Sequence, residues 1–275
     1  MLRNTLVLLA VAGLFTFTVE AALAQSDSNF TISPPPLAYP SYAPGSAEKI
    51  SLATISVEAK GFEMSGASFN YVSRGNIQSP GEDTDVTPLG SAFSVNMGLT
   101  QLSGEGTGFT MEYISFPFGL GYEKELFNND GNNFIAFGGM TYEMSTMEVE
   151  FGKNNSTTYI SMLGFKVGGQ MTFTAGSLKI SPFFFMTQAS GSAETGTYIY
   201  DPCCASFSDT VDINVSSSAY GFDILHTDSG ITLSSILQQA ISDKSEVNIT
   251  ILQISYSFGG SVDADRKSGL DINVQ

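Results

Sequence analysis

The chain has 275 residues, of which 42% are hydrophobic and only 14% charged, and its formal net charge is −16. This acidic balance disfavours nucleic acid and anionic membrane surfaces as partners, because both attract Lys and Arg. An ordinary globular protein has about 25% charged residues, so the low fraction of charged residues in this chain needs an explanation. After the first 24 residues no segment supplies about 18 uninterrupted apolar residues, which excludes a helical membrane protein and distributes the apolar surface along strands.

The first 24 residues predict a secretory signal peptide. Arg3 precedes an apolar run from Leu6 to Phe17, and residues 22–24 form an A-x-A cleavage site. The apolar run is shorter than the roughly 20 residues that a membrane-spanning helix needs. We therefore expect cleavage after Ala24. Residues 25–48 hold five of the ten prolines and predict an extended, solvated lead-in.

From Lys49 onward, short alternating segments separated by Gly, Asn, Asp and Ser clusters predict a series of strands. The expected strands lie near residues 49–59, 62–73, 91–102, 109–122, 132–148, 157–174, 177–189, 215–226, 230–240 and 246–258. We expect the folded part to span residues 49–259, with a polar tail at 260–275.

The alternation has an unusual composition, best seen in residues 157–174. One parity carries Tyr159, Leu163, Phe165, Val167 and Met171, and the other carries Gly164, Lys166, Gly168 and Gln170. A soluble sandwich gives the same alternation, but its solvated face normally carries many charged residues, whereas small polar side chains fit the inside of a narrow barrel. The apolar parity is therefore predicted to face lipid.

Turn lengths predict ten strands. The tight turns at 174–177 and 226–230 then lie at one end and the long loop 190–214 at the other. The alternative is an eight-stranded barrel in which 49–73 is one strand and 231–241 is a helix, because the apolar residues of 231–241 also fit a 3.6-residue period. Pro117 and Pro182 fall inside expected strands, where proline is tolerated mainly at bulges or ends.

Two stretches, ISFPFGLGYEKEL (114–126) and YGFDILHTDSGITLSSILQQAISDKSEVNITILQISYSF (220–258), resemble the small bacterial outer-membrane β-barrels. The second is similar to three terminal barrel strands. The resemblance covers roughly 49–259 and implies an all-β, antiparallel transmembrane barrel in the bacterial outer membrane. Its partners would be outer-membrane lipids and the barrel assembly machinery. Two features depart from that pattern: a tail follows Phe258, and Gln253 stands where Gly is often found.

Alternation sends four charged side chains toward the barrel interior. These are Glu143, Lys166, Lys179 and Asp223. They would either line a small pore or form an internal salt-bridge network, and the network is favoured because unpaired charges in a confined site are costly. The expected function is a structural or narrow passive-channel role without catalysis, cofactor or metal.

The two cysteines, Cys203 and Cys204, are adjacent and are bridged within one chain only through a strained ring. We read them as a pair in a loop, with a redox-labile vicinal disulfide or a bridge to another chain as the alternatives. The acidic groups at 81–85 and 263–271 do not have the spacing of a calcium-binding loop.

His226 is the only histidine, which removes most zinc sites. With Asp228 and Ser229 it resembles a nucleophilic triad, but three residues in one five-residue turn do not easily reach the required geometry. Two other functions stay open: a secreted soluble β-sandwich for adhesion or surface binding, and an outer-membrane lipid-modifying enzyme. The face assignment also predicts that Phe165→Arg blocks assembly while Gly168→Ser is mild.

Overall fold

The computed structural model describes residues 46–59, 62–77, 90–106, 108–129, 132–199, 205–242 and 246–258. The expected signal peptide, most of the lead-in, the two cysteines and the C-terminal tail lie outside the described residues. Among those described, no helix is long and apolar enough to cross a bilayer.

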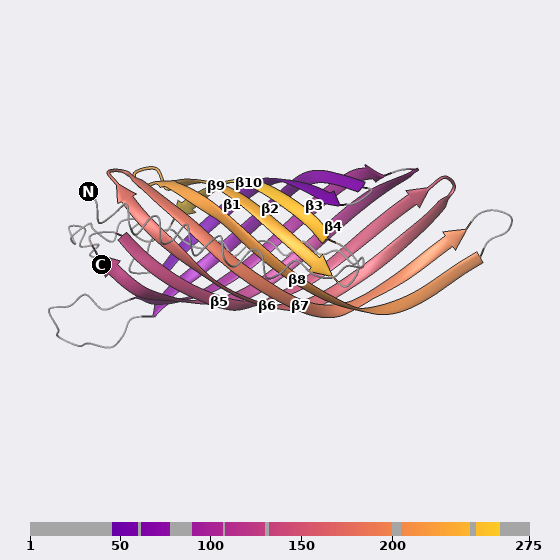
Figure 1. Ribbon diagram of the computed structural model, residues 1–275, viewed down its shortest axis with the longest axis horizontal. Coiled ribbons are helices and arrows are strands. Elements are labelled where there is room, and N and C mark those ends of the chain that lie inside the picture. Colours follow the sequence, from indigo (N-terminus) through magenta and orange to yellow (C-terminus); the bar gives the residue numbers. More distant parts are fainter. Residues whose placement is uncertain are drawn as a thin grey trace, which may run out of the picture.

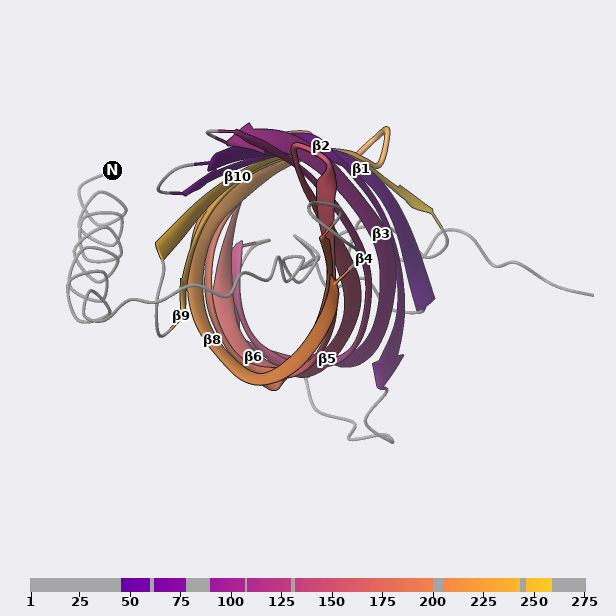
Figure 2. The ribbon, with the colours of Figure 1, turned by 90° about the vertical axis from the view of Figure 1, so that its right-hand side faces the viewer.

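The described residues form ten strands, and each strand pairs antiparallel with the next along the chain (Figure 1). Pairing of the first strand with the last closes the sheet into a barrel, which Figure 2 shows from one end. The strands are β1 (Ser46–Ala59), β2 (Phe62–Ile77), β3 (Ser91–Gly106), β4 (Phe109–Asn129), β5 (Asn132–Phe151), β6 (Asn154–Ala175), β7 (Leu178–Ile199), β8 (Ala205–His226), β9 (Ile231–Ser242) and β10 (Glu246–Phe258). The prediction of a ten-stranded antiparallel barrel is confirmed.

The two ends of the barrel are named here by what they carry. The terminal end is where β1 begins and β10 ends, and it includes the turns at 176–177 and 227–230. The hairpin end carries the β1–β2 connection at 60–61 and the β7–β8 connection. The two tight turns at the terminal end contain Gly176, with φ of 62°, and Gly230, with φ of 70°. Residues that carry a side chain rarely adopt a positive φ, so glycine suits both positions.

Several strands are longer than expected, and the largest difference lies at residues 190–214. Residues 190–214 were expected to be a long loop, yet β7 continues to Ile199 and β8 begins at Ala205. Residues 190–199 of β7 carry mostly Ser, Thr and Gly on both parities, so the difference between faces that signals a strand is weak there. In β8, by contrast, Val211, Ile213 and Val215 share the inward parity, and this period of two was overlooked.

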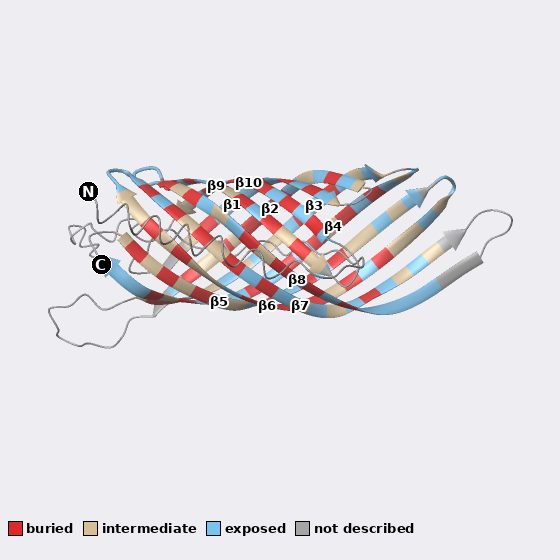
Figure 3. Ribbon diagram, in the orientation of Figure 1, coloured by how far each residue is buried: buried red, intermediate tan, exposed pale blue. Residues whose placement is uncertain are grey.

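Buried and exposed positions alternate along the strands (Figure 3), and the exposed positions fall into two zones by residue type. Toward the terminal end, large apolar side chains point outward and are exposed on every strand, for example Leu52, Phe118, Phe165, Phe222 and Ile254. We call this zone the apolar belt. Toward the hairpin end, outward positions of the same strands carry Ser, Thr, Gln and carboxylates instead. An apolar outer band on a closed barrel is the surface that faces lipid in membrane-spanning barrels.

The interior also has two zones, with the opposite arrangement. Behind the apolar belt most buried side chains are polar or charged, with Val72, Ala92, Ile135 and Leu225 as apolar exceptions, whereas toward the hairpin end the inward positions are mostly apolar. This apolar plug is one cluster of buried residues that includes Ile55, Val57, Met64, Leu102, Met111, Ile160, Met162, Ile213, Ile236, Val247 and Ile249. The hairpin half is therefore built like a soluble β-barrel, with apolar side chains inside and polar side chains outside.

The inside-outside assignment of residues 157–174 is confirmed. Tyr159, Leu163, Phe165 and Val167 are exposed on the outside of β6, and Lys166 and Gln170 are buried on the inside. The alternative helix at 231–241 is the strand β9. Its helical period arises because Leu233 and Leu237 belong to the belt while Ile236 and Ala240 face the apolar plug, so apolar residues occur on both parities.

Pro117 and Pro182 each lie where pairing is interrupted on one side of the strand, while the other side stays paired. The β3–β4 register passes from Met97↔Phe118 to Thr100↔Ser115 and skips Pro117. The β6–β7 register passes from Gln170↔Phe183 to Phe173↔Ile180 and skips Pro182. Proline has no N–H to donate to the ladder, so each interruption falls where no bond is available.

Candidate functional site

The candidate site is the polar half of the lumen, behind the apolar belt. Among the described residues, eight charged side chains are buried: the cations Lys49, Arg74, Lys166 and Lys179 and the anions Glu123, Glu125, Glu143 and Asp223. Four positive and four negative groups give this interior no net charge, although the whole chain is at −16. The acidic excess of the chain therefore lies outside the described lumen.

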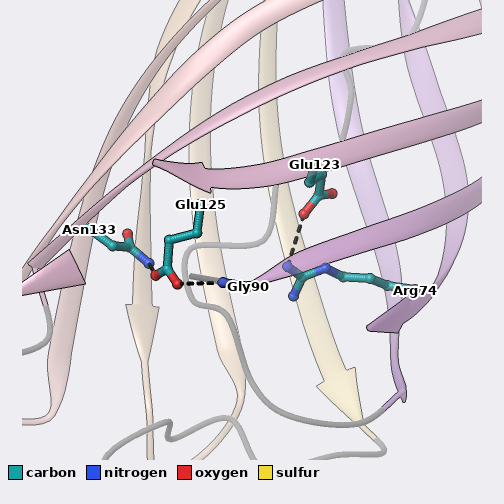
Figure 4. Close-up of polar contacts among 5 residues, drawn as sticks. All are labelled: Arg74, Gly90, Glu123, Glu125 and Asn133. Atoms are coloured by element: carbon teal, nitrogen blue, oxygen red, sulfur yellow. Dashed lines mark hydrogen bonds and ion pairs between the residues drawn. The ribbon is translucent and has the colours of Figure 1, made fainter. Parts of the chain in front are cut away.

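Arg74 and Glu123 form a buried ion pair. The Nη2 atom of Arg74 lies 3.0 Å from Oε2 of Glu123, and both side chains are almost fully buried (Figure 4). Arg74 comes from the end of β2 and Glu123 from β4, with β3 between them. Lys49 of β1 also attracts Glu123 electrostatically. Several cationic partners are what a carboxylate needs in a confined, poorly hydrated space.

Glu125 anchors the segment that leads into β3. Its Oε2 accepts a hydrogen bond of 3.1 Å from the backbone N–H of Gly90 (Figure 4). Its Oε1 accepts bonds from the amide groups of Asn128, at 2.9 Å, and Asn133, at 3.1 Å. The carboxylate thus holds three elements together at the terminal end, β4, β5 and the start of β3.

Glu143 lies at the border between the polar half and the apolar plug. Its Oε1 accepts hydrogen bonds from the hydroxyl of Tyr113, at 2.5 Å, and from that of Ser115, at 2.7 Å. Lys166 attracts the carboxylate electrostatically and also lies over the ring of Phe185, with Nζ 5.2 Å from the ring centroid. Hydrogen bonds to a carboxylate and a nearby cation together offset the loss of its hydration.

Asp223 and Lys179 complete the set, on β8 and β7. Asp223 is attracted electrostatically by Lys49. Asp223 is directly opposite Ser181, two residues from Lys179 on the same face of β7. The four residues expected to face the lumen are thus all buried there, and the structure links Glu143 with Lys166 and Asp223 with Lys49.

Four buried charges were missed from the sequence. Arg74 and Glu123 each follow directly after an expected strand, 62–73 and 109–122, and the real strands continue past both residues. Glu125 lies in the same extension of β4. Lys49 was the first residue of an expected strand, and its parity with Ser51 was a usable signal for the interior.

Other sequence candidates lie away from the lumen. His226 and Ser229 are in contact, with 3.0 Å between Nδ1 and Oγ, in the exposed turn at the terminal end. Asp228 is exposed in the same turn. Within the described ranges, no group of three His, Cys, Asp or Glu side chains is placed to hold a metal ion.

The inward-facing side chains of the polar half are largely buried. A cavity of about 30 Å³ has Glu123, Thr141 and Lys166 among its lining residues. This part of the lumen holds its own side chains, as expected for a barrel of this size.

Comparisons with solved structures find other barrels. The outer membrane protease OmpT from Escherichia coli aligns with 78% of this chain and 96% of its own, at 10% identity and a TM-score of 0.49. The translocator domain of the autotransporter NalP from Neisseria meningitidis aligns with 93% of this chain and 98% of its own, at 10% identity and a TM-score of 0.41. No protein-family model matches the sequence, and no curated protein matches it.

Proposed function

We propose that the protein is an integral barrel of the bacterial outer membrane with a structural role. The apolar belt sits in the bilayer, the terminal end faces the periplasm, and the hairpin half projects from the opposite surface. The exposed belt carries this proposal, since side chains such as Phe165, 58% exposed, and Leu233, 54% exposed, have no apolar partner except lipid.

The lumen supports a structural role more than a passive channel. A continuous water path through the barrel would have to cross both the polar half of the lumen and the apolar plug, and each of them obstructs it in its own way. In the polar half, opposite charges hold one another across the interior. In the hairpin half, the apolar plug fills the same space with buried aliphatic side chains, and aqueous channels come with about 16 strands or more.

Recording from planar bilayers tests the role. The purified, refolded protein should give little or no conductance under conditions in which a large porin gives steady currents. Large, ion-selective currents from the wild-type chain would replace the structural role with that of a channel. Insertion is verified first by protease protection of the belt in vesicles of the same lipid composition, so that a lack of current reports on inserted protein.

Location and assembly are tested separately. We expect the protein in the outer-membrane fraction, and we expect it to migrate differently on a gel with and without heating, because a closed barrel resists detergent until it is heated. Depletion of the barrel assembly machinery should lower the heat-modifiable fraction. A protein that stays soluble without detergent would overturn the membrane assignment.

A further inference from the structure

The β7–β8 hairpin projects beyond the rest of the barrel and leaves one strand edge open. β8 pairs with β7 along its whole length, from Ala205 to His226. Its pairing with β9 begins only at Val215, opposite Ser242. Residues 205–214 therefore have a strand on one side, and on the other side no strand of the described residues pairs with them. Figure 1 shows this hairpin extending past its neighbours.

The exposure pattern agrees with an open edge. From Ile213 to Ala219 the residues of β8 alternate between buried and more exposed, but the five residues from Ser208 to Asp212 are all exposed. Val211, on the inward parity, is 47% exposed because no opposite wall covers it at this height. Ten residues of free edge correspond to about 34 Å of backbone, at about 3.4 Å per residue.

The backbone N–H of Thr210 is one hydrogen-bond donor on this open edge. The N–H of Thr210 donates to Oδ1 of the neighbouring Asp209, at 2.9 Å, and so does not take part in the ladder with β7. This N–H points to the open side of β8, where the carboxylate of Asp209 accepts its hydrogen bond. An exposed local bond of this kind is easily exchanged for a bond to another strand.

The charges on the edge select what pairs with it. Asp209 and Asp212 lie on opposite faces of the strand, and Glu194 of β7 is opposite Thr210. A second copy of this chain would bring its own aspartates against these, and like charges across strands are destabilising. A basic strand would place cations beside the carboxylates and a β-branched residue beside Val211.

We propose that the free edge of β8, residues 205–214, binds an extended basic segment of another polypeptide by strand addition. Backbone hydrogen bonds give the affinity, as in other complexes formed by strand addition. Asp209 and Asp212 give the preference for lysine or arginine at positions three residues apart, one on each face. The edge lies outside the apolar belt, so this proposal does not depend on the absence of conductance.

The test uses the full-length barrel in detergent and a fluorescent peptide made of two Lys-Thr-Val-Lys repeats. Binding is followed by anisotropy. We expect saturable binding, no binding of the peptide with Glu in place of Lys, and loss of binding when alternate peptide nitrogens are methylated. Equal binding of the basic and acidic peptides, or binding that survives methylation, would overturn the proposal.

Two sets of variants locate the binding. Asp209→Asn with Asp212→Asn should weaken the peptide at least tenfold. The matched control is Glu58→Gln with Glu63→Gln, which removes two exposed carboxylates from the same end of the barrel but on the fully paired strands β1 and β2. An equal loss in the control would mean nonspecific attraction to an acidic surface.

Thr210→Pro removes the edge N–H without removing a ladder bond, so the barrel should remain heat-modifiable while the peptide no longer binds. Normal binding by this variant would contradict strand addition. Sedimentation of the protein alone gives one more decisive outcome. Dimers that Thr210→Pro abolishes would mean that a second copy occupies the edge.

Discussion

Arg74 and Glu123 meet where each is almost without access to water, and neither can be removed without leaving the other charged group in the lumen. Arg74→Met should therefore destabilise the barrel by about 3–5 kcal/mol, the cost of breaking a buried pair. Urea unfolding of the refolded protein measures it. Lys153→Met, at an exposed turn, is the control and should have little effect. The double variant Arg74→Met with Glu123→Gln should recover most of the loss, and failure to do so would mean that the pair is not the cause.

Lys166 attracts the carboxylate of Glu143, which also accepts hydrogen bonds from two hydroxyls. Lys166→Met should lower heat stability, because Glu143 loses its cation, but by less than Arg74→Met, because Tyr113 and Ser115 still donate to it. Adding Tyr113→Phe should cost a further 1–3 kcal/mol or so, the usual penalty for a buried acceptor that loses a donor. If the losses of stability from Lys166→Met and Tyr113→Phe simply add, as they do for two distant surface residues, then the two side chains do not act on the same carboxylate.

Gly168 corrects one sequence expectation. A Cβ atom at this position would lie 2.3 Å from the carbonyl oxygen of Phe184 and 2.6 Å from the ring of Phe137. Gly168→Ser is therefore expected to destabilise the barrel instead of being mild. Gly138 on β5 is the matched control, since its nearest neighbour would be 3.4 Å away. Comparable melting temperatures for the two serine variants would contradict this reading.

At the scale of a strand, β6 crosses from the belt to the polar outer zone. Phe165→Arg places a charge in the belt and should cost about 2–4 kcal/mol near the bilayer midplane. Thr157→Arg has the same strand, the same outward parity and the same new side chain, but it lies above the belt opposite Glu148. Refolding yield into vesicles should fall for the first variant only. A similar yield for both would mean that the belt is misplaced.

The central part of every strand was predictable, because apolar residues on the outer face alternate there with polar residues on the inner face and give a strong period of two. Some ends were not, because the contrast between the two faces fades there, as in residues 190–199 of β7. One readable signal was missed. In β10, Val247, Ile249 and Ile251 share one parity, and Leu252, Ile254 and Tyr256 share the other. That change of phase marks where the apolar side chains move from the inside to the outside.

At the scale of the whole molecule, the two zones predict how deep the barrel sits. The chain contains no tryptophan, so a single introduced Trp reports its own surroundings. Phe118→Trp, in the belt, should be quenched strongly by brominated lipid, and Ser56→Trp, on the outer face of β1 near the hairpin end, should not. Equal quenching at both sites would place the hairpin half inside the bilayer as well.

The order of the strands around the barrel has a kinetic consequence. Nine of the ten pairings join strands that are neighbours in the chain, and each forms as a hairpin across a connection. Only the seam of β1 with β10 joins distant residues, from Glu48↔Phe258 to Ala59↔Val247. Contacts between distant residues carry the largest loop-closure entropy, so closure of this seam is expected to limit the folding rate. Until it closes, two rows of backbone groups remain unpaired, which lipid cannot satisfy.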